Sequence, residues 1–348
     1  MAKATHRVII GIGIAGNRAA ETLRQQDPDC RITMITLSRL PFYNRYDLPN
    51  VFHGWHDWRK LLAHPPAYYE DHRFTLRRDT RVINVDGRER RLTLAHNEEI
   101  HYDQVVVCSG GRGYLPEELS DYTHLMDGFA SFEAAMTVYR RLPPGGHVVM
   151  LGGDMIGLDL ARVLIETGYR VTLVVNDYTF WPHRVAAGDR GRFLEALERV
   201  GIGLYDGAPL EVIAEGTEGA APRRLTFKDG GSLDGDVVMP FYGLVPSVEF
   251  MLGSGVDIER GLLVNPQLTT TNEDIWAAGD VCQIWSAEEN AYRFYYGWNN
   301  VRAMGEVAAR NMCGEAGDFQ GAGDESLCLD RKGHIDSPLW RHDRDGRA

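Results

Sequence analysis

The sequence of 348 residues has few long apolar segments. No apolar run approaches the roughly 18–20 residues needed to cross a bilayer, so we expect no membrane span. The N-terminus enters a short apolar run without the hydrophobic stretch of a signal peptide. We therefore expect a cytoplasmic protein.

Cysteine is scarce, at five residues, and no two of them form a CxxC pair. Without such a pair, or a grouping with zinc-ligand spacing, we expect neither a local redox disulfide nor a metal site. The run from His53 to Trp58 contains two histidines, but it lacks a third ligand and is better explained as an aromatic loop. The cysteines are Cys30, Cys108, Cys282, Cys313 and Cys328.

Positive charge is also in deficit, because 37 Lys and Arg face 49 Asp and Glu, for a net charge of −12. This balance argues against a nucleic-acid-binding protein, which would carry a basic face. No GxSxG or GxxxxGK[ST] motif occurs, which excludes the common serine-hydrolase and P-loop sites. The length fits two domains or one large one, at about 150 residues per domain.

Glycine, by contrast, is abundant, with 38 residues. Near the N-terminus an apolar run, a GxGxxG motif, a helix-forming stretch and a second apolar run follow one another, at residues 8–10, 11–16, 17–26 and 32–37. This is the β–turn–α–β order of a dinucleotide site. Gly11 would make the tight turn, Gly13 would admit the pyrophosphate and Gly16 would let helix and strand pack closely. A glycine turn in an unrelated α/β unit is the alternative.

A similar arrangement recurs about 140 residues later, which indicates two nucleotide-binding folds in one chain. A strand at 147–151 leads into a glycine loop, a helix ending at Thr167 and a strand at 171–175. This second motif is imperfect, because Asp154 replaces the middle glycine and Asn176 follows the second strand. The loop residues expected to face a second dinucleotide are Gly152, Gly153, Asp154, Ile156 and Gly157.

The remaining segments complete an α/β pattern. Residues 73–101 alternate in polarity, which predicts a small antiparallel sheet with a turn at Asp86-Gly87. A buried strand is expected at 102–108 and a final helix at 298–312. Between them lie another apolar run at 236–242 and the segment 275–281. After Gly314 the chain is polar and irregular, with one strand expected at 326–329 before a turn at Lys332-Gly333.

Taken together, these segments resemble the FAD/NAD(P)-linked pyridine nucleotide–disulfide oxidoreductase superfamily. The branch most similar holds rubredoxin reductases, NADH oxidases and the flavin domain of NADH-dependent nitrite reductase. The resemblance covers about residues 6–313 and rests on the two glycine motifs and three further segments: Phe42–Pro49, Tyr102–Gly110 and Thr270–Val281, the last ending in Ala-Gly-Asp.

The resemblance implies an α/β fold of two Rossmann-like, three-layer nucleotide-binding domains with a truncated C-terminal tail. A discontinuous FAD domain would span 1–115 and 244–313, around an NAD(P)-binding-like domain at 116–243. The tail, 314–348, would be too short for the interface domain of longer relatives. We therefore expect any oligomer to differ from theirs.

The resemblance also assigns roles in FAD binding. Asp280 would accept hydrogen bonds from the ribityl hydroxyls, Arg45 would lie near the phosphates and Trp298 near the flavin ring. The alternatives are a helix N-cap for Asp280 and a core aromatic for Trp298. The full set of expected FAD-binding residues is Gly11, Gly13, Ile14, Ala15, Gly16, Arg45, Ser109, Gly110, Gly279, Asp280 and Trp298.

Several positions depart from the family pattern. Residues 42–50 contain no cysteine, which excludes a dithiol mechanism like that of glutathione reductase. Asn50 stands where branch members often carry lysine, and Asp159 replaces the helix glutamate near the flavin–nicotinamide contact. The usual acid for the FAD ribose falls near Leu37-Ser38, which leaves only the hydroxyls of Thr36 and Ser38 nearby.

The resulting hypothesis is an FAD-dependent oxidoreductase that moves electrons between NAD(P)H and a redox protein or partner subunit. The alternative is an FAD-containing electron-transfer or assembly subunit with an impaired NAD(P) site, and a flavin-free scaffold is a third. Asp154 should weaken direct reduction by NAD(P)H, because it places a carboxylate beside a diphosphate. A loop that shifts and turns Asp154 outward as a helix cap would instead leave a usable site. Asn176 does not distinguish NADH from NADPH.

Overall fold

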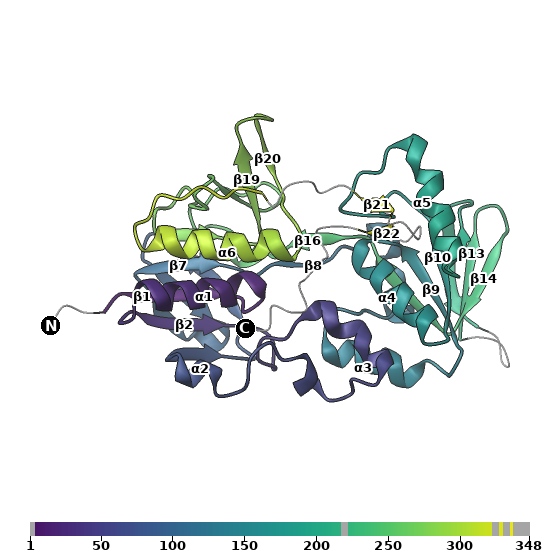
Figure 1. Cartoon of the computed structure of the whole chain (residues 1–348), viewed down its shortest axis with the longest axis horizontal. Helices are drawn as coiled ribbons and strands as arrows, with labels where there is room; N and C mark the ends of the chain where they lie inside the picture. Colours follow the sequence, from purple (N-terminus) through teal and green to yellow (C-terminus); the bar gives the residue numbers. More distant parts are fainter. Residues whose placement is uncertain (1–3, 217–221, 322–326, 330–334, 337–348) are drawn as a thin grey trace.

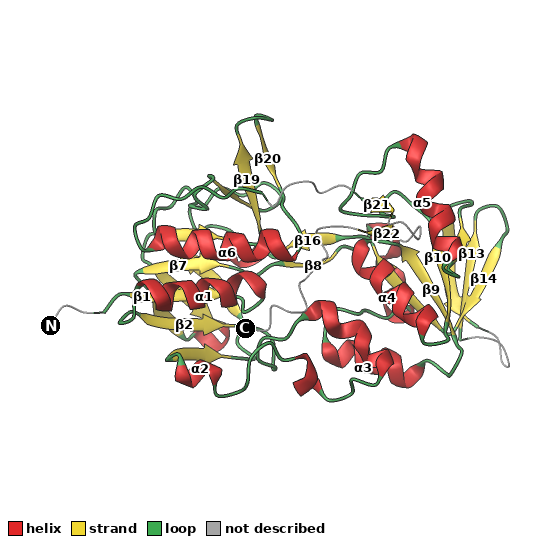
Figure 2. Ribbon diagram, viewed as in Figure 1, coloured by secondary structure: helices red, strands yellow, loops and turns green. Residues whose placement is uncertain are grey.

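The computed structural model describes residues 4–216, 222–321, 327–329 and 335–336. The described chain forms two halves, each built around a parallel β-sheet (Figure 1). Helices lie against both sheets, and short strands form smaller sheets around them (Figure 2). Within the described residues, no helix is long and apolar enough to cross a membrane.

The first sheet has five parallel strands in the order β18-β7-β1-β2-β3. The apolar runs of the sequence are its central strands, and continuous burial on both faces explains why they lack alternating polarity. The strands are β1 (His6–Ile10), β2 (Arg31–Ile35), β3 (Phe74–Arg77), β7 (Gln104–Val107) and β18 (Ile275–Ala277).

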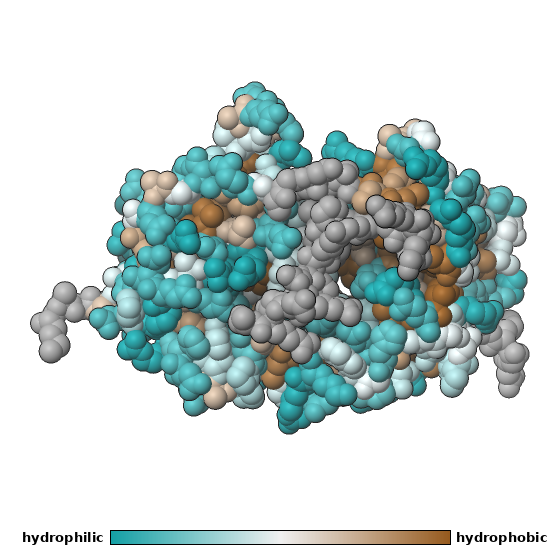
Figure 3. Space-filling model, in the orientation of Figure 1, coloured by the Kyte–Doolittle hydropathy of each residue, from teal (hydrophilic) through white to brown (hydrophobic). Residues whose placement is uncertain are grey.

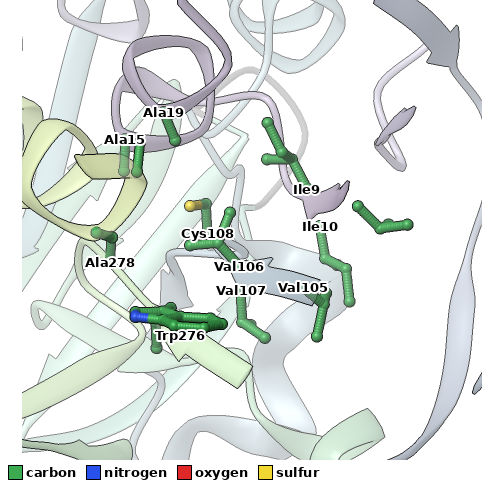
Figure 4. Packing of buried hydrophobic residues seen from close by; sticks show 14 of the residues in the cluster. Ile9, Ile10, Ala15, Ala19, Val105, Val106, Val107, Cys108, Trp276 and Ala278 are labelled. Atoms are coloured by element: carbon green, nitrogen blue, oxygen red, sulfur yellow. The ribbon is translucent and has the colours of Figure 1, made fainter. Parts of the chain in front are cut away.

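Helix α1 (Ile14–Gln26) and helix α6 (Trp298–Met312) lie side by side against this sheet (Figure 1). In Figure 4, Ala15 and Ala19 lie beside Cys108 and the valines of β7, within one buried cluster. The helices approach closely at Gly305, where an added Cβ would lie 2.3 Å from the carbonyl oxygen of Ala15. Position 305 of α6 therefore needs glycine, because the backbones of α6 and α1 are in contact there.

We expect Gly305→Ala to lower the free energy of unfolding by about 1–3 kcal/mol, because the methyl group overpacks the contact between α1 and α6. Urea denaturation would measure the change. Gly191→Ala in α5 (Ala187–Arg199) is the matched control, since an added Cβ there meets no atom within 4 Å. The control should be neutral or stabilising, because alanine is the better helix former. Equal effects at both positions would contradict the packing argument.

Two smaller three-stranded sheets accompany the first half. The antiparallel sheet predicted at 73–101 is one of them: β4, β5 and β6 are antiparallel, and the chain turns after Asp86. The other contains β17, β19 and β20. Their bounds are Val82–Asp86, Arg91–Leu94, Glu99–His101, Leu262–Val264, Cys282–Ser286 and Ala291–Arg293; the short helix α2 spans Tyr68–Asp71.

The second half has a four-stranded parallel sheet in the order β11-β10-β9-β15. Helices α3, α4 and α5 pack with it around a second buried cluster, and an antiparallel sheet β12-β13-β14 lies at its far end (Figure 1). The bounds are β9 (His147–Gly152), β10 (Arg170–Val174), β11 (Gly203–Tyr205), β15 (Val237–Phe241), β12 (Leu210–Glu215), β13 (Arg223–Phe227), β14 (Ser232–Gly235), α3 (Phe132–Arg141) and α4 (Met155–Glu166).

Two chain crossings connect the halves. Strand β8 (Gly111–Gly113) leaves the first half, and β16 (Leu244–Pro246) returns to it; the two pair antiparallel. The 3-10 helix η1 (Arg45–His53) of the first half also contacts α3 and α4. The other 3-10 helices are η2 (Trp58–Leu61), η3 (Ala95–Asn97), η4 (Glu117–Leu125) and η5 (Glu249–Met251).

The described parts of the tail contact both halves. Phe319 is buried in the core of the first half, and its ring centroid lies 5.2 Å from that of Tyr295. Strand β21 (Cys328–Leu329) pairs with β22 (Ile335–Asp336), and Leu329 and Ile335 pack against the core of the second half. The turn expected at Lys332-Gly333 lies outside the described residues. On the face in Figure 3, hydrophilic residues cover most of the described surface.

Candidate functional site

The candidate site lies where three strands of the first sheet end. The parallel register pairs Ile10 of β1 with Val107 of β7, and Val107 with Ala277 of β18. The segments that follow these strands therefore meet at one sheet edge. Ligands of open α/β sheets bind at this edge, beyond the carboxyl ends of the strands.

The three glycines of the first motif have different surroundings. Gly11 has φ +101°, and an added Cβ would lie 2.1 Å from the carbonyl oxygen of Cys108. At Gly16 the same atom would lie 2.0 Å from the carbonyl oxygen of Gly11. At Gly13 it would meet no protein atom within 4 Å. The first and third glycines thus serve packing, and the middle one faces open space.

Gly13 is the N-cap of α1, and no side chain caps this helix end. The first N–H groups of a helix have no partner within the helix. The N–H groups of Ile14 and Ala15, at the start of α1, are therefore available to an anion. Asn17 supports the loop from inside, because its amide donates to the carbonyl oxygens of Ile12 and Gly13. The positive end of the helix dipole adds to the attraction.

Asp280 follows β18 at the same edge, after Gly279, whose φ is +88°. No helix begins at Asp280, and α6 is capped by Gly297, so the helix-cap alternative for Asp280 is wrong. The Oδ1 atom of Asp280 is buried and, among the described residues, accepts no hydrogen bond. Burial raises the pKa of this carboxyl to about 6, although the charge of Arg45 acts to lower it.

An unpartnered buried carboxylate oxygen is costly unless a ligand supplies a donor. The ribityl hydroxyls of FAD are such donors, and the uncapped α1 end suits its pyrophosphate. The residues present therefore fit FAD. Arg45, at the start of η1, is exposed but acts electrostatically on Asp280, which suits a cation beside the phosphates.

Aromatic side chains from distant segments gather beside Asp280. The ring of Trp298 lies edge-on to Tyr46, with ring centroids 6.1 Å apart. Burial, with the Asp280 carboxylate nearby, raises the pKa of both Tyr46 and Tyr296. Trp298 is half-buried, at the first turn of α6. Sequence reasoning missed Tyr46 and Tyr296, although each lies within two residues of a predicted position.

Ser109 and Gly110 lie where β7 passes into the crossing strand β8. The hydroxyl of Ser109 donates to the carbonyl oxygen of Ser247, 2.9 Å away. The N–H of Ser247 donates to the carbonyl oxygen of Gly110, also at 2.9 Å. Gly110 has φ +63°, and an added Cβ there would meet no atom within 4 Å. These two residues join the site edge to the returning chain.

The second glycine loop is tightly packed. An added Cβ at Gly152 would lie 2.2 Å from the carbonyl oxygen of Phe241, and one at Gly157 would lie 2.5 Å from the ring of Phe241. At Gly153 it would lie 2.8 Å from the side chain of Leu173. Ile156 is half-buried in the first turn of α4.

Asp154 caps α4, but its side chain is turned into the protein, and not outward as the helix-cap alternative expects. It is the N-cap of α4 and only 3% exposed. The N–H of Gly157 donates to its Oδ1 and the N–H of Gly243 donates to its Oδ2, each at 2.9 Å. Burial raises the pKa of Asp154 to about 6, while the backbone N–H groups of Gly157, Gly243 and Ile156 act to lower it.

Asn176 is similarly engaged within its own loop. Its Oδ1 accepts from the N–H of Tyr178 at 2.8 Å, and its own N–H donates to Thr179 Oγ1 at 3.1 Å. This side chain closes an Asx turn. It does not project as a free acceptor for a ribose hydroxyl.

Asp159 lies on α4, with a side chain that is 42% exposed. Its Oδ1 accepts from Arg162 at 2.9 Å, one turn along the helix. Asn50 of η1 donates instead to Asp47 Oδ1 at 3.4 Å. Helix η1 does contact α4, but these two residues bond to neighbours on their own elements. A role for Asp159 near the flavin stays a prediction.

No group of three His, Cys, Asp or Glu side chains in the described ranges is arranged to hold a metal ion. In the aromatic loop, the ring of His56 lies 4.3 Å from that of Tyr139, and its Nε2 lies 3.1 Å from the carbonyl oxygen of Val51. All five cysteines are free thiols.

The fold and the site define a class: two nucleotide-binding folds in one chain, the first shaped for a flavin dinucleotide. The family model described as "pyridine nucleotide-disulphide oxidoreductase" matches residues 5–299. The chain belongs to this family, as its sequence predicts. It is an enzyme with an α/β fold, an FAD-dependent oxidoreductase.

The relatives point to the predicted branch. A "nitric oxide reductase FlRd-NAD(+) reductase" of Aeromonas hydrophila is 30% identical over 287 residues, covering 81% of this chain and 71% of the relative. An "NADH-rubredoxin oxidoreductase" of Clostridium acetobutylicum is 25% identical over 322 residues, covering 91% and 77%. The solved ferredoxin reductase of the CYP199A2 system from Rhodopseudomonas palustris is 26% identical with a TM-score of 0.80, covering 91% and 78%.

Proposed function

We propose that this chain passes electrons between NAD(P)H and a small redox protein, with FAD held at the end of the first sheet. The observation that carries the proposal is the juxtaposition of the open Gly13 with the buried, unpartnered Oδ1 of Asp280. The open helix end at Gly13 suits a phosphate group, and the unpartnered oxygen of Asp280 suits hydroxyl donors. FAD has both.

In this proposal the N-terminal turn of α1 binds the pyrophosphate through backbone N–H groups. Asp280 accepts from ribityl hydroxyls, and Arg45 offsets phosphate charge. When bound, FAD supplies hydride acceptance and electron release, which the protein orients and tunes. The proposed FAD domain spans 1–115 and 244–313, and the NAD(P)-binding-like domain spans 116–243.

Cys108 and Cys282 do not suit a thiol relay. Burial raises the pKa of the Cys108 and Cys282 thiols, so both are protonated at neutral pH. A protonated, buried thiol is a poor nucleophile. This supports electron transfer through the flavin without a protein disulfide.

The redox partner is proposed from the relatives. Their names specify rubredoxin, FlRd and a ferredoxin as partners. We propose a small iron–sulfur or rubredoxin-type protein as the acceptor. The second candidate, an FAD-containing electron-transfer subunit with an impaired NAD(P) site, is favoured specifically by the inward position of Asp154.

The test uses the purified chain after FAD supplementation, without oxygen. We expect a yellow protein that releases one FAD per chain on denaturation. After reduction of the flavin by one equivalent of dithionite, it should reduce added rubredoxin or ferredoxin, followed by their visible bands. Bleaching by NADH or NADPH then separates the two candidates. A colourless protein, or a reduced flavin that reduces neither acceptor, would overturn the proposal.

A further inference from the structure

The helices that follow the two glycine motifs have different N-caps. At α1 the N-cap is Gly13, no side chain caps the helix, and the space beside Gly13 is open. At α4 the N-cap is Asp154, whose carboxylate accepts from the N–H of Gly157. The second helix therefore already has an anion at its N-terminus, and that anion belongs to the protein.

Other polar groups at the start of α4 are also engaged. The N–H of Met155 donates to the carbonyl oxygen of Trp181 at 2.9 Å, and the N–H of Phe180 donates to the carbonyl oxygen of Gly153 at 2.7 Å. Phe180 is completely buried. The segment after β10 thus packs onto the glycine loop, where a dinucleotide would otherwise reach the helix end.

The second bond of Asp154 reaches the crossing between the halves. Gly243 lies between β15 and the crossing strand β16, with φ +81°. Trp181 packs against it, since an added Cβ at Gly243 would lie 2.6 Å from the indole ring. The ring centroids of Trp181 and Tyr296, which belongs to the first half, are also 4.7 Å apart. Asp154 therefore ties the start of α4 to residues beside the proposed flavin site.

We propose that Asp154 occupies the place of the dinucleotide pyrophosphate, so that NAD(P)H binds only when this carboxylate leaves Gly157 and Gly243. A diphosphate needs the same helix N–H groups, and its charge would repel the carboxylate at contact distance. Asp154 is then the residue that sets nucleotide affinity. The inference rests on the proposed function and deepens it, because it concerns entry of the electron donor.

The consequence for Gly243 follows from the geometry. When a dinucleotide displaces Asp154, the Gly243 N–H loses its acceptor at the crossing strand. Nucleotide binding is thereby coupled to the segment that joins the two halves. Without nucleotide, the same bond holds α4 and β16 in one arrangement.

The experiment compares FAD-loaded wild type with Asp154→Gly and Asp154→Asn. Binding of NADH and NADPH to the oxidised protein is measured by calorimetry, and flavin reduction by anaerobic rapid mixing. We expect Asp154→Gly to bind at least one nucleotide about tenfold tighter or better, because it removes the competing anion. Asp154→Asn keeps one acceptor for Gly157 but loses the charge, so its affinity should lie between the two.

Glu195→Gln on α5 is the matched control, because it removes one exposed negative charge from the same half and should leave affinity unchanged. Hydrogen exchange of the peptide containing Gly243 gives an independent readout. We expect faster exchange at Gly243 in Asp154→Gly than in wild type, and faster exchange in wild type when nucleotide binds.

Equal nucleotide affinity in wild type and both Asp154 variants would overturn the inference. If Asp154→Gly fails to fold, Asp154→Asn decides alone, and wild-type affinity in that variant is the contrary result. Electron transfer from dithionite-reduced flavin to rubredoxin does not involve the nucleotide. It therefore tests the proposed function separately, and either idea can fail without the other.

Discussion

Gly13→Glu should yield a folded protein without bound flavin. An added Cβ at Gly13 meets no protein atom within 4 Å, so the fold accommodates the side chain. The new carboxylate would lie against the proposed pyrophosphate. Two unit charges about 4–5 Å apart repel by roughly 3–4 kcal/mol at an effective dielectric of about 20, which corresponds to a few hundredfold in FAD affinity. The visible spectrum after FAD supplementation measures the loss.

Gly191→Glu is the control for this substitution, because Gly191 also has open space around its Cβ position but lies on α5 of the other half. The control should keep its FAD. Far-ultraviolet circular dichroism should be native-like for both variants. A Gly13→Glu protein that retains stoichiometric FAD would show that the pyrophosphate does not approach this turn.

The fold could be predicted because its main helices and strands have recognisable local sequence patterns. The helix expected at 298–312 is α6 at those bounds, and the predicted strand at 147–151 is β9 with one further residue. Continuous apolar runs identify strands that are buried on both faces of a parallel sheet. Each glycine motif and its helix lie between two such runs, which is typical of a parallel pair joined by a helical crossover. The pairs β1–β2 and β9–β10 are of this kind.

The site could be predicted only where a residue's surroundings are set by the motif that contains it. The packing of Gly11 and Gly16 and the openness at Gly13 follow from the turn itself. The direction of the Asp154 side chain does not, because its second partner, Gly243, lies 89 residues away in sequence. A single sequence gives no signal for that contact.

The aromatic residues beside Asp280 show the same limit. Tyr46 and Trp298 are brought together by η1 and α6, elements that lie far apart in the sequence. Trp181 meets Tyr296 across the two halves. Such contacts depend on how the halves pack, and the helix η1 that contacts α3 and α4 contains a proline and no strong apolar period.

Asp280→Asn should stabilise the protein without FAD while weakening FAD binding. Burial raises the pKa of Asp280 to about 6 in the fold, against its ordinary value of 3.8. The folded state therefore binds a proton more readily than the unfolded chain does. The resulting destabilisation is absent below about pH 4, grows between pH 4 and 6, and is complete at pH 7.

The amide carries no charge to bury, so Asp280→Asn should raise the free energy of unfolding of the flavin-free protein by about 1–3 kcal/mol at pH 7, with little change at pH 4. The same substitution removes a charged acceptor for the ribityl hydroxyls, which should cost about 10- to 100-fold in FAD affinity. Denaturation of the flavin-free protein at both pH values and fluorescence titration with FAD measure the two effects. Opposite signs are expected only if the carboxylate is retained for a ligand, since a purely structural aspartate would lose stability on substitution and leave FAD affinity unchanged.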